Sequence, residues 1–152
     1  MTKKLILLLL ICILSSLKIN ATVYSGSCGT NVSYSLDTNT GVLKITGTGP
    51  MANYGVYSPP YAPWFFEYSY VKTVEIADGV TNIGERAFDG ADIPTVIPLI
   101  ENPFTIEGKT LYARTFSQNT FNNATLYVPR GTIEKYKATD GWKDFLFNED
   151  EY

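Results

Sequence analysis

Few side chains in this sequence are of types that could do acid–base or metal chemistry, and their spacing supports neither. Asp89 and Asp92 lie three residues apart, and the acidic tail holds Glu149, Asp150 and Glu151. Such carboxylates could serve glycoside hydrolysis or calcium binding, but neither set has EF-hand spacing or another supporting pattern. The chain also has no histidine, so it lacks the usual general base at neutral pH and the serine–histidine triad. We therefore expect no enzyme activity, no metal and no cofactor.

The composition fits one globular domain with a single core. The 152 residues are 45% hydrophobic, 14% aromatic and 18% charged, which excludes intrinsic disorder. The formal net charge of -3 offers no basic surface for a phosphate backbone, so we expect no nucleic-acid binding.

The first 21 residues have the pattern of a secretory signal peptide. Lys3 and Lys4 precede the apolar run Leu5–Leu14, and a short polar region then ends at the small residue Ala21. A membrane anchor is the alternative, but this run spans only about half of a hydrocarbon core roughly 30 Å thick. Cleavage after Ala21 removes three lysines and no acid, which leaves nine bases against fifteen acids and a net charge of -6. We expect a secreted or cell-surface protein that meets a membrane only through this leader.

Cys28 is the one cysteine that would remain after cleavage, so no intrachain disulfide can form. Free cysteines are among the most buried residue types. We expect a small buried side chain here rather than a reactive or intermolecular thiol.

Alternation of apolar and polar residues predicts an antiparallel hairpin near the start of the mature chain. Residues 32–36 and 43–46 both alternate, and the polar segment between them ends in Gly41. That segment predicts a hairpin loop with a positive φ angle. Gly47, Gly49 and Pro50 are expected to end the second strand.

Further along, two more strands are predicted. One covers residues 71–76 and is followed by a turn at Asp78 and Gly79. Residues 80–88 read as an irregular loop with apolar side chains facing inward. The other strand covers residues 94–98, where Pro94 indicates a sheet edge or a bulge.

Residues 51–70 form an aromatic segment interrupted by prolines. The aromatic rings could be stacking platforms for a sugar or peptide ligand, or could fill the seam between the hairpin and the next strand. A small domain without disulfides needs apolar bulk, so we expect Trp64 and Phe65 in the seam. Proline-rich stretches run over the surface, so the tyrosines of this segment are the candidate partner contacts. They are Tyr54, Tyr57 and Tyr61.

Two internal sequence similarities indicate a repeat of short strand-plus-loop units. Residues 72–76 align with residues 94–98 at an offset of 22, within the roughly 20–29 residues of leucine-rich repeats. Residues 88–91 align with residues 121–124 at an offset of 33, which implies an insertion between Leu99 and Thr120. One such unit cannot bury its own apolar edge, so neighbouring units must stack.

Several segments together carry a family resemblance. They are CGTNVSYSL at 28–36, GVLKITGTGPM at 41–51, VEIADGVTNIGERAF at 74–88, and LYVPRGT at 126–132 with residues 136–137 and 141–145. In this order they resemble the opening module, the repeat unit and the terminal cap of BspA-like leucine-rich repeat surface proteins. The resemblance implies a right-handed solenoid of short strands in a bacterial surface or secreted protein that adheres to host or microbial surfaces, and it implies no enzyme. Only one repeat is complete, so this chain offers little of the concave face of long members.

A short helix is predicted over residues 133–138, with Thr132 as its N-cap and Gly141 where it stops. Its inward side is expected to hold Ile133, Tyr136 and Ala138. Behind it, Trp142 and Phe145 are expected to cover the open edge of the last strand, and residues 148–152 to fray.

These features predict a mainly β fold, a short leucine-rich repeat solenoid with an N-terminal β-hairpin module and a C-terminal capping helix. The expected units are the signal peptide 1–21, the hairpin module and aromatic loop 22–70, repeat turns 71–128 with the second degenerate, and the helical cap with the acidic tail 129–152.

The expected function is non-catalytic binding or adhesion, with a protein or glycan on a host or microbial surface as the partner. One alternative is a structural remnant of a longer repeat protein with no ligand of its own. The other alternative is a small secreted hydrolase.

Overall fold

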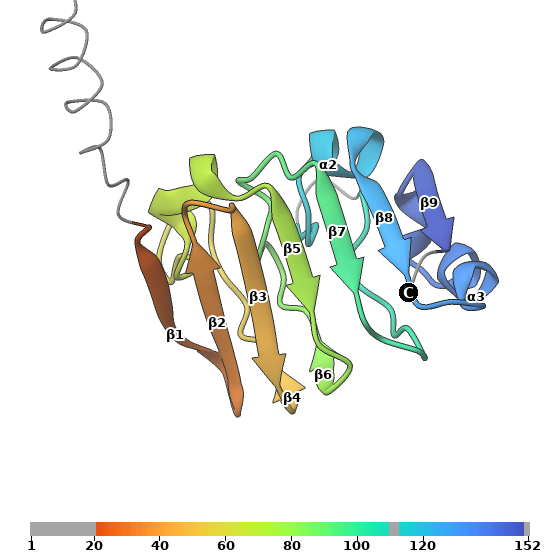
Figure 1. The fold of residues 1–152 in the computed structure, drawn as a ribbon, viewed down its shortest axis with the longest axis horizontal. Coiled ribbons are helices and arrows are strands. Elements are labelled where there is room, and N and C mark those ends of the chain that lie inside the picture. The colour runs from red at the N-terminus through yellow and green to blue at the C-terminus, as the bar shows by residue number, and fades with distance from the viewer. Residues whose placement is uncertain (1–20, 110–112, 151–152) are drawn as a thin grey trace, which may run out of the picture.

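Most of the chain folds around one seven-stranded sheet. The computed structural model describes residues 21–109 and 113–150, and the strand order is β1-β2-β3-β5-β7-β8-β9 (Figure 1). This confirms the predicted mainly β class. Of the expected signal peptide, only Ala21 lies within the described residues. In those ranges, none of the helices combines the length and the apolar character needed to span a bilayer.

The predicted hairpin is present as β2 (Val32–Asp37) and β3 (Val42–Gly47). The two strands pair antiparallel with Leu36 opposite Leu43, and Gly41 in the loop has a φ of 74°. A further strand, β1 (Val23–Gly29), pairs antiparallel with β2. Its residues up to Ser27 are exposed and show no apolar alternation, so the pattern that predicts the hairpin does not predict β1.

After the hairpin the strands run parallel. They are β5 (Thr73–Ile76), β7 (Thr95–Pro98), β8 (Thr125–Val128) and β9 (Phe147–Asp150), and β5 also lies parallel to β3. Thr73 pairs with Thr95, which confirms the predicted offset of 22. Thr95 pairs with Thr125 at an offset of 30, and Thr125 pairs with Phe147 at 22 again.

β7 lies inside the sheet, between β5 and β8, so the edge position expected from Pro94 is wrong. Pro94 precedes the strand, so its missing N–H group leaves no hydrogen bond of the sheet unmade. Its carbonyl oxygen accepts a hydrogen bond from the Thr125 amide at 3.0 Å. The proline therefore marks the start of an interior strand.

The C-terminal tail also differs from expectation, because residues 147–150 form β9 instead of fraying. β9 pairs with β8, so the strand itself satisfies the edge that Trp142 and Phe145 were expected to cover. Both of those rings are buried in the core. An unpaired parallel edge recruits whatever extended backbone is near, even where the sequence has no apolar alternation.

Two short strands form a second sheet. β4 (Gly49–Pro50) pairs parallel with β6 (Val80–Asn82), so the irregular loop expected over residues 80–88 begins with a strand. The apolar side chains of that segment are buried as predicted: Val80, Ile83, Ala87 and Phe88.

The helices are short: η1 (Phe65–Tyr70), α2 (Gln118–Asn123), α3 (Ile133–Ala138) and η2 (Trp142–Asp144). α3 matches the predicted helix, although the Thr132 hydroxyl donates to the Pro129 carbonyl oxygen at 2.7 Å and makes no cap bond. Tyr136 is buried and Ile133 partly buried, as expected. Ala138 is exposed, so its predicted inward position is wrong.

One side of the sheet packs against loops filled with aromatic rings. Register partners Leu43, Val74, Val96 and Leu126 are fully buried on that side. The Phe88 ring stacks on Phe116, with centroids 5.0 Å apart, and the two residues form a parallel β-bridge. The predicted alignment of Phe88 with Phe121 is therefore wrong, because Phe116 takes the neighbouring place.

Candidate functional site

The aromatic segment is fixed to the core by Trp64. This side chain is fully buried, its indole N–H donates to the Ala87 carbonyl oxygen at 3.0 Å, and its ring stacks on Phe88 at 5.4 Å. Tyr34 of the hairpin contacts the same ring edge-on at 5.3 Å. Trp64 thus fills the seam as predicted, while Phe65 is only half-buried.

Beside this anchor, three rings form a cluster at the surface, which we call the aromatic surface: Tyr61, Phe65 and Phe66. Tyr61 stacks on Phe65 at 4.6 Å, and Phe66 lies edge-on to Phe65 at 5.3 Å and to Tyr61 at 6.4 Å. Phe66 is 80% exposed. A cluster of partly exposed aromatic rings at the surface is typical of a contact site for another molecule.

Tyr57 lies in the loop that precedes the aromatic surface. The loop is closed by a hydrogen bond from the Gly55 amide to the Pro60 carbonyl oxygen at 2.7 Å, and Tyr57 is 92% exposed. Of the three predicted contact residues, Tyr57 and Tyr61 are accessible to a partner, with Tyr61 half-buried.

Tyr54 is placed differently from the prediction. Its hydroxyl donates to the Cys28 carbonyl oxygen at 3.0 Å, and its ring packs edge-on against Trp64 at 6.1 Å. Burial raises the pKa of the phenol, and the side chain is half-buried against the core. The expectation that Tyr54 is an exposed loop residue is therefore wrong, because a buried indole and a backbone acceptor hold it inward.

A hollow of about 420 Å³ lies beside Tyr54. Its lining includes Cys28, Gly29, Pro50, Met51 and Pro63. Cys28 is 3% exposed, as expected for a small buried side chain, and burial raises the pKa of its thiol to about 11. The thiol is therefore protonated at neutral pH and is no nucleophile.

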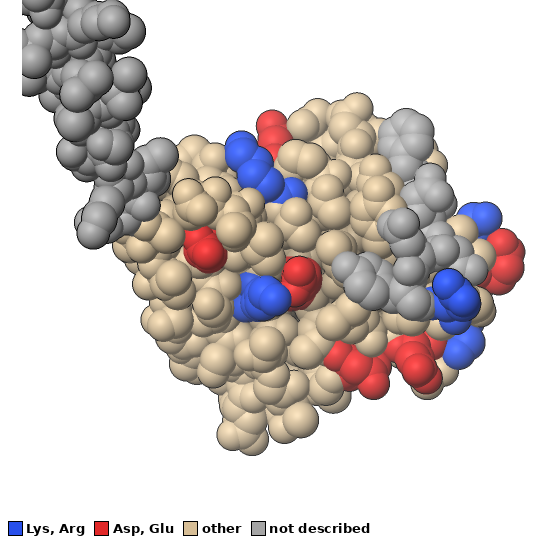
Figure 2. Space-filling view, in the orientation of Figure 1, with Lys and Arg blue, Asp and Glu red and all other residues tan. Residues whose placement is uncertain are grey.

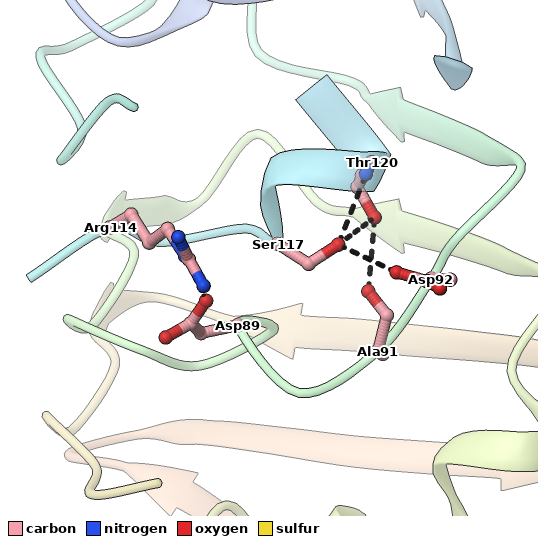
Figure 3. Close-up of polar contacts among 6 residues, drawn as sticks. All are labelled: Asp89, Ala91, Asp92, Arg114, Ser117 and Thr120. Carbon is pink, nitrogen blue, oxygen red and sulfur yellow. Dashed lines mark hydrogen bonds and ion pairs between the residues drawn. The ribbon is translucent and has the colours of Figure 1, made fainter. Parts of the chain in front are cut away.

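The two candidate carboxylates of the central loop serve structural contacts (Figure 3). Asp89 forms an ion pair with Arg114, and Asp92 accepts a hydrogen bond from the Ser117 hydroxyl at 3.0 Å. Both contacts join residues 89–92 to the segment that leads into α2. Across residues 21–109 and 113–150, no group of three or more acidic, cysteine or histidine side chains could hold a metal ion. Glu151 of the acidic tail lies outside the described residues.

The other side of the sheet is open and mostly uncharged, with a few scattered acidic and basic side chains (Figure 2). Thr73, Thr95 and Thr125 form a register-matched row on it, and Lys44 pairs with Glu75 at 3.1 Å. These side chains are short or already paired, and they offer no aromatic ring to a partner.

Comparison with known proteins finds a structural resemblance at low sequence identity. Neither a family model nor a curated protein matches the sequence. A solved structure that resembles it is a leucine-rich repeat protein from Eubacterium ventriosum, at 18% sequence identity and a TM-score of 0.49. The match covers 74% of this chain and 29% of that chain, so this chain spans less than a third of that protein's length.

Proposed function

We propose that this chain is a non-catalytic binding protein that contacts its partner through the aromatic surface and Tyr57. The observation that carries the proposal is the contrast within one short segment, where Trp64 is fully buried and Phe66, two residues later, is 80% exposed. An anchored segment that holds apolar rings in water pays a solvation cost unless a partner covers them.

The proposal also covers the type of repeat fold and the place where the protein acts. The parallel strands β5, β7 and β8 are successive turns of a short leucine-rich repeat solenoid of the BspA-like type, and α3 with η2 closes its C-terminal end. The 22-residue register between β5 and β7 supports this assignment. The units are those expected from the sequence, residues 22–70, 71–128 and 129–152, in a secreted or surface-displayed bacterial protein. The partner is a protein or glycan on a host or microbial surface.

A binding assay on intact cells and on immobilised glycans tests the function. We compare the purified protein with the variants Phe66→Ser and Tyr57→Ser, which remove exposed rings and leave the core unchanged. Leu146→Ser is the matched control, because Leu146 is an exposed apolar side chain, at 63%, that lies after η2, far along the chain from the aromatic surface. We expect the first two variants to lose retention and the control to keep it.

Two outcomes would favour the alternatives. If the protein is retained by no cell surface or glycan, it is a structural remnant without a ligand. If it turns over a glycoside and that turnover survives purification, it is a hydrolase. Equal retention by Phe66→Ser and Leu146→Ser would move the contact away from the aromatic surface.

A further inference from the structure

β1 forms one edge of the seven-stranded sheet, and within the described part of the chain nothing pairs with its outer side. The first five of its seven residues are exposed. A sheet edge of this kind presents unpaired amide and carbonyl groups to any extended chain that approaches.

The register shows which backbone groups are free. The Thr22 carbonyl oxygen accepts from the Thr38 amide at 3.1 Å, and Tyr24 pairs with Leu36 two residues further along. Hydrogen-bonded and non-hydrogen-bonded pairs alternate along an antiparallel ladder, so Tyr24 and Gly26 bond to β2. The amide and carbonyl groups of Val23, Ser25 and Ser27 therefore point away from the sheet.

Apart from the register shift between Ser27 and Gly29, this edge has neither of two common protections, charged side chains and proline. No Asp, Glu, Lys or Arg occurs from Ala21 to Leu36, and β1 holds no proline. The part of the surface over β1 that Figure 2 leaves uncovered carries no charged side chain. The opposite edge strand, β9, contains Glu149 and Asp150 in its sequence, and like charges that face each other across a strand pair are destabilising. Pairing with an identical strand is therefore not opposed by charge at β1, whereas like charges disfavour it at β9.

We propose that β1 pairs antiparallel with β1 of a second copy of this chain, so that a two-fold axis joins the two sheets into one. Such a contact is self-complementary and closes at two copies.

One register uses every free backbone group. With Ser25 opposite Ser25 of the other copy, Val23 lies opposite Ser27, and all outward amide and carbonyl groups find partners. The same register sets Tyr24 opposite Gly26. Tyr24 is 39% exposed, and the Tyr34 ring lies over Gly26, which has no side chain of its own, so in this register Tyr24 of one copy would pack beside Tyr34 of the other. The shift in register between Ser27 and Gly29 ends the pairing there.

Sedimentation velocity of the purified protein tests the proposal. The paired edge is short, so association is followed from roughly 1 to 500 µM. We expect a monomer–dimer equilibrium. Because residue 25 faces itself, Ser25→Lys and Ser25→Asp should each weaken dimerisation by about tenfold or more, and an equimolar mixture of the two should restore it. Ser33→Lys is the matched control, since it adds the same charge to the same face one strand inward and leaves dimerisation unchanged.

Four results with the wild type and the Ser25 variants would overturn the proposal, and a fifth, with Phe66→Ser, would move the interface. The four are a wild-type protein that stays monomeric over the whole range, a dimer that Ser25→Lys leaves intact, charge variants whose mixture stays monomeric, and assemblies that grow beyond two copies. The last result would point to head-to-tail pairing of β1 with β9. Loss of dimerisation in Phe66→Ser would place the interface on the aromatic surface instead.

Discussion

The indole N–H of Trp64 donates a hydrogen bond to the carbonyl oxygen of Ala87 at 3.0 Å. This bond joins the aromatic segment, residues 51–70, to the loop that follows β6. Tyr68 donates to the same oxygen at 3.3 Å, so the two side chains share one acceptor. This buried contact fixes the place of the segment that carries the aromatic surface.

Replacement of Trp64 should therefore destabilise the whole fold. Trp64→Ala leaves a large cavity against Phe88, and we expect it to lower the free energy of unfolding by about 3–5 kcal/mol. Trp64→Phe loses the hydrogen bond and part of the ring, and should cost about 1–2 kcal/mol, since Tyr68 still satisfies Ala87. Urea unfolding followed by circular dichroism measures both. A loss below about 1 kcal/mol for Trp64→Ala would contradict the anchoring role.

Loss of the hydroxyl group should lower the free energy of unfolding at Tyr54 but not at Tyr57. Tyr54→Phe removes the hydrogen bond to the Cys28 carbonyl and should cost about 1 kcal/mol. Tyr57→Phe changes a side chain that is 92% exposed and should stay within about 0.5 kcal/mol of the wild type. Equal unfolding midpoints for the two variants would show that the Tyr54 hydroxyl faces water.

Ser117 should be a sensitive position, because its hydroxyl takes part in three contacts at once, one of them with the Thr120 hydroxyl at 3.0 Å. It accepts from the Thr120 amide at 3.0 Å as the N-cap of α2, and it donates to Asp92 (Figure 3). Ser117→Ala should lower the free energy of unfolding by about 1–2 kcal/mol. Gln118→Ala, at the exposed next position, serves as the control and should change it by less than about 0.5 kcal/mol. If thermal unfolding shifts by the same amount in both variants, the cap is not formed in solution.

Stability should fall in alkaline solution partly because of Cys28. Burial raises the pKa of its thiol from 9.0 to about 11, so the folded protein binds this proton more tightly than the unfolded chain does. The contribution is complete below pH 9 and is lost as the pH rises toward 11. Cys28→Ala should therefore show a shallower decline of the urea midpoint between pH 8.5 and 10.5 (roughly the window of the shift). Parallel declines in the two proteins would mean that the thiol is open to solvent.

The sequence predicted the elements whose apolar residues alternate. The β2–β3 hairpin and β5 alternate more and less buried side chains, β7 was found from its apolar run between two prolines, and the offset between β5 and β7 follows from their similar residues. β1 and β9 lack that alternation. They are strands because a neighbouring edge offers hydrogen-bond partners, and such tertiary information does not reside in the local pattern.

The candidate site was predictable in part. The proline-rich composition indicates a surface segment, which fits Tyr57, and aromatic bulk indicates the seam, which fits Trp64. Phe66 was missed because its neighbours Phe65 and Trp64 suggest burial, and only the turn of η1 directs its ring outward. Tyr54 was misplaced because its acceptor, the Cys28 carbonyl, lies 26 residues away in the sequence.

The number of residues between paired positions differs from one pair of parallel strands to the next, and this has a practical consequence. β7 and β8 stay in register although thirty residues separate them, eight more than between β5 and β7. The surplus is absorbed in the connection between those strands, without disturbing the pairing on either side. A foreign epitope or reporter peptide is therefore best grafted within that connection but away from Phe116 and Phe121, which belong to the core.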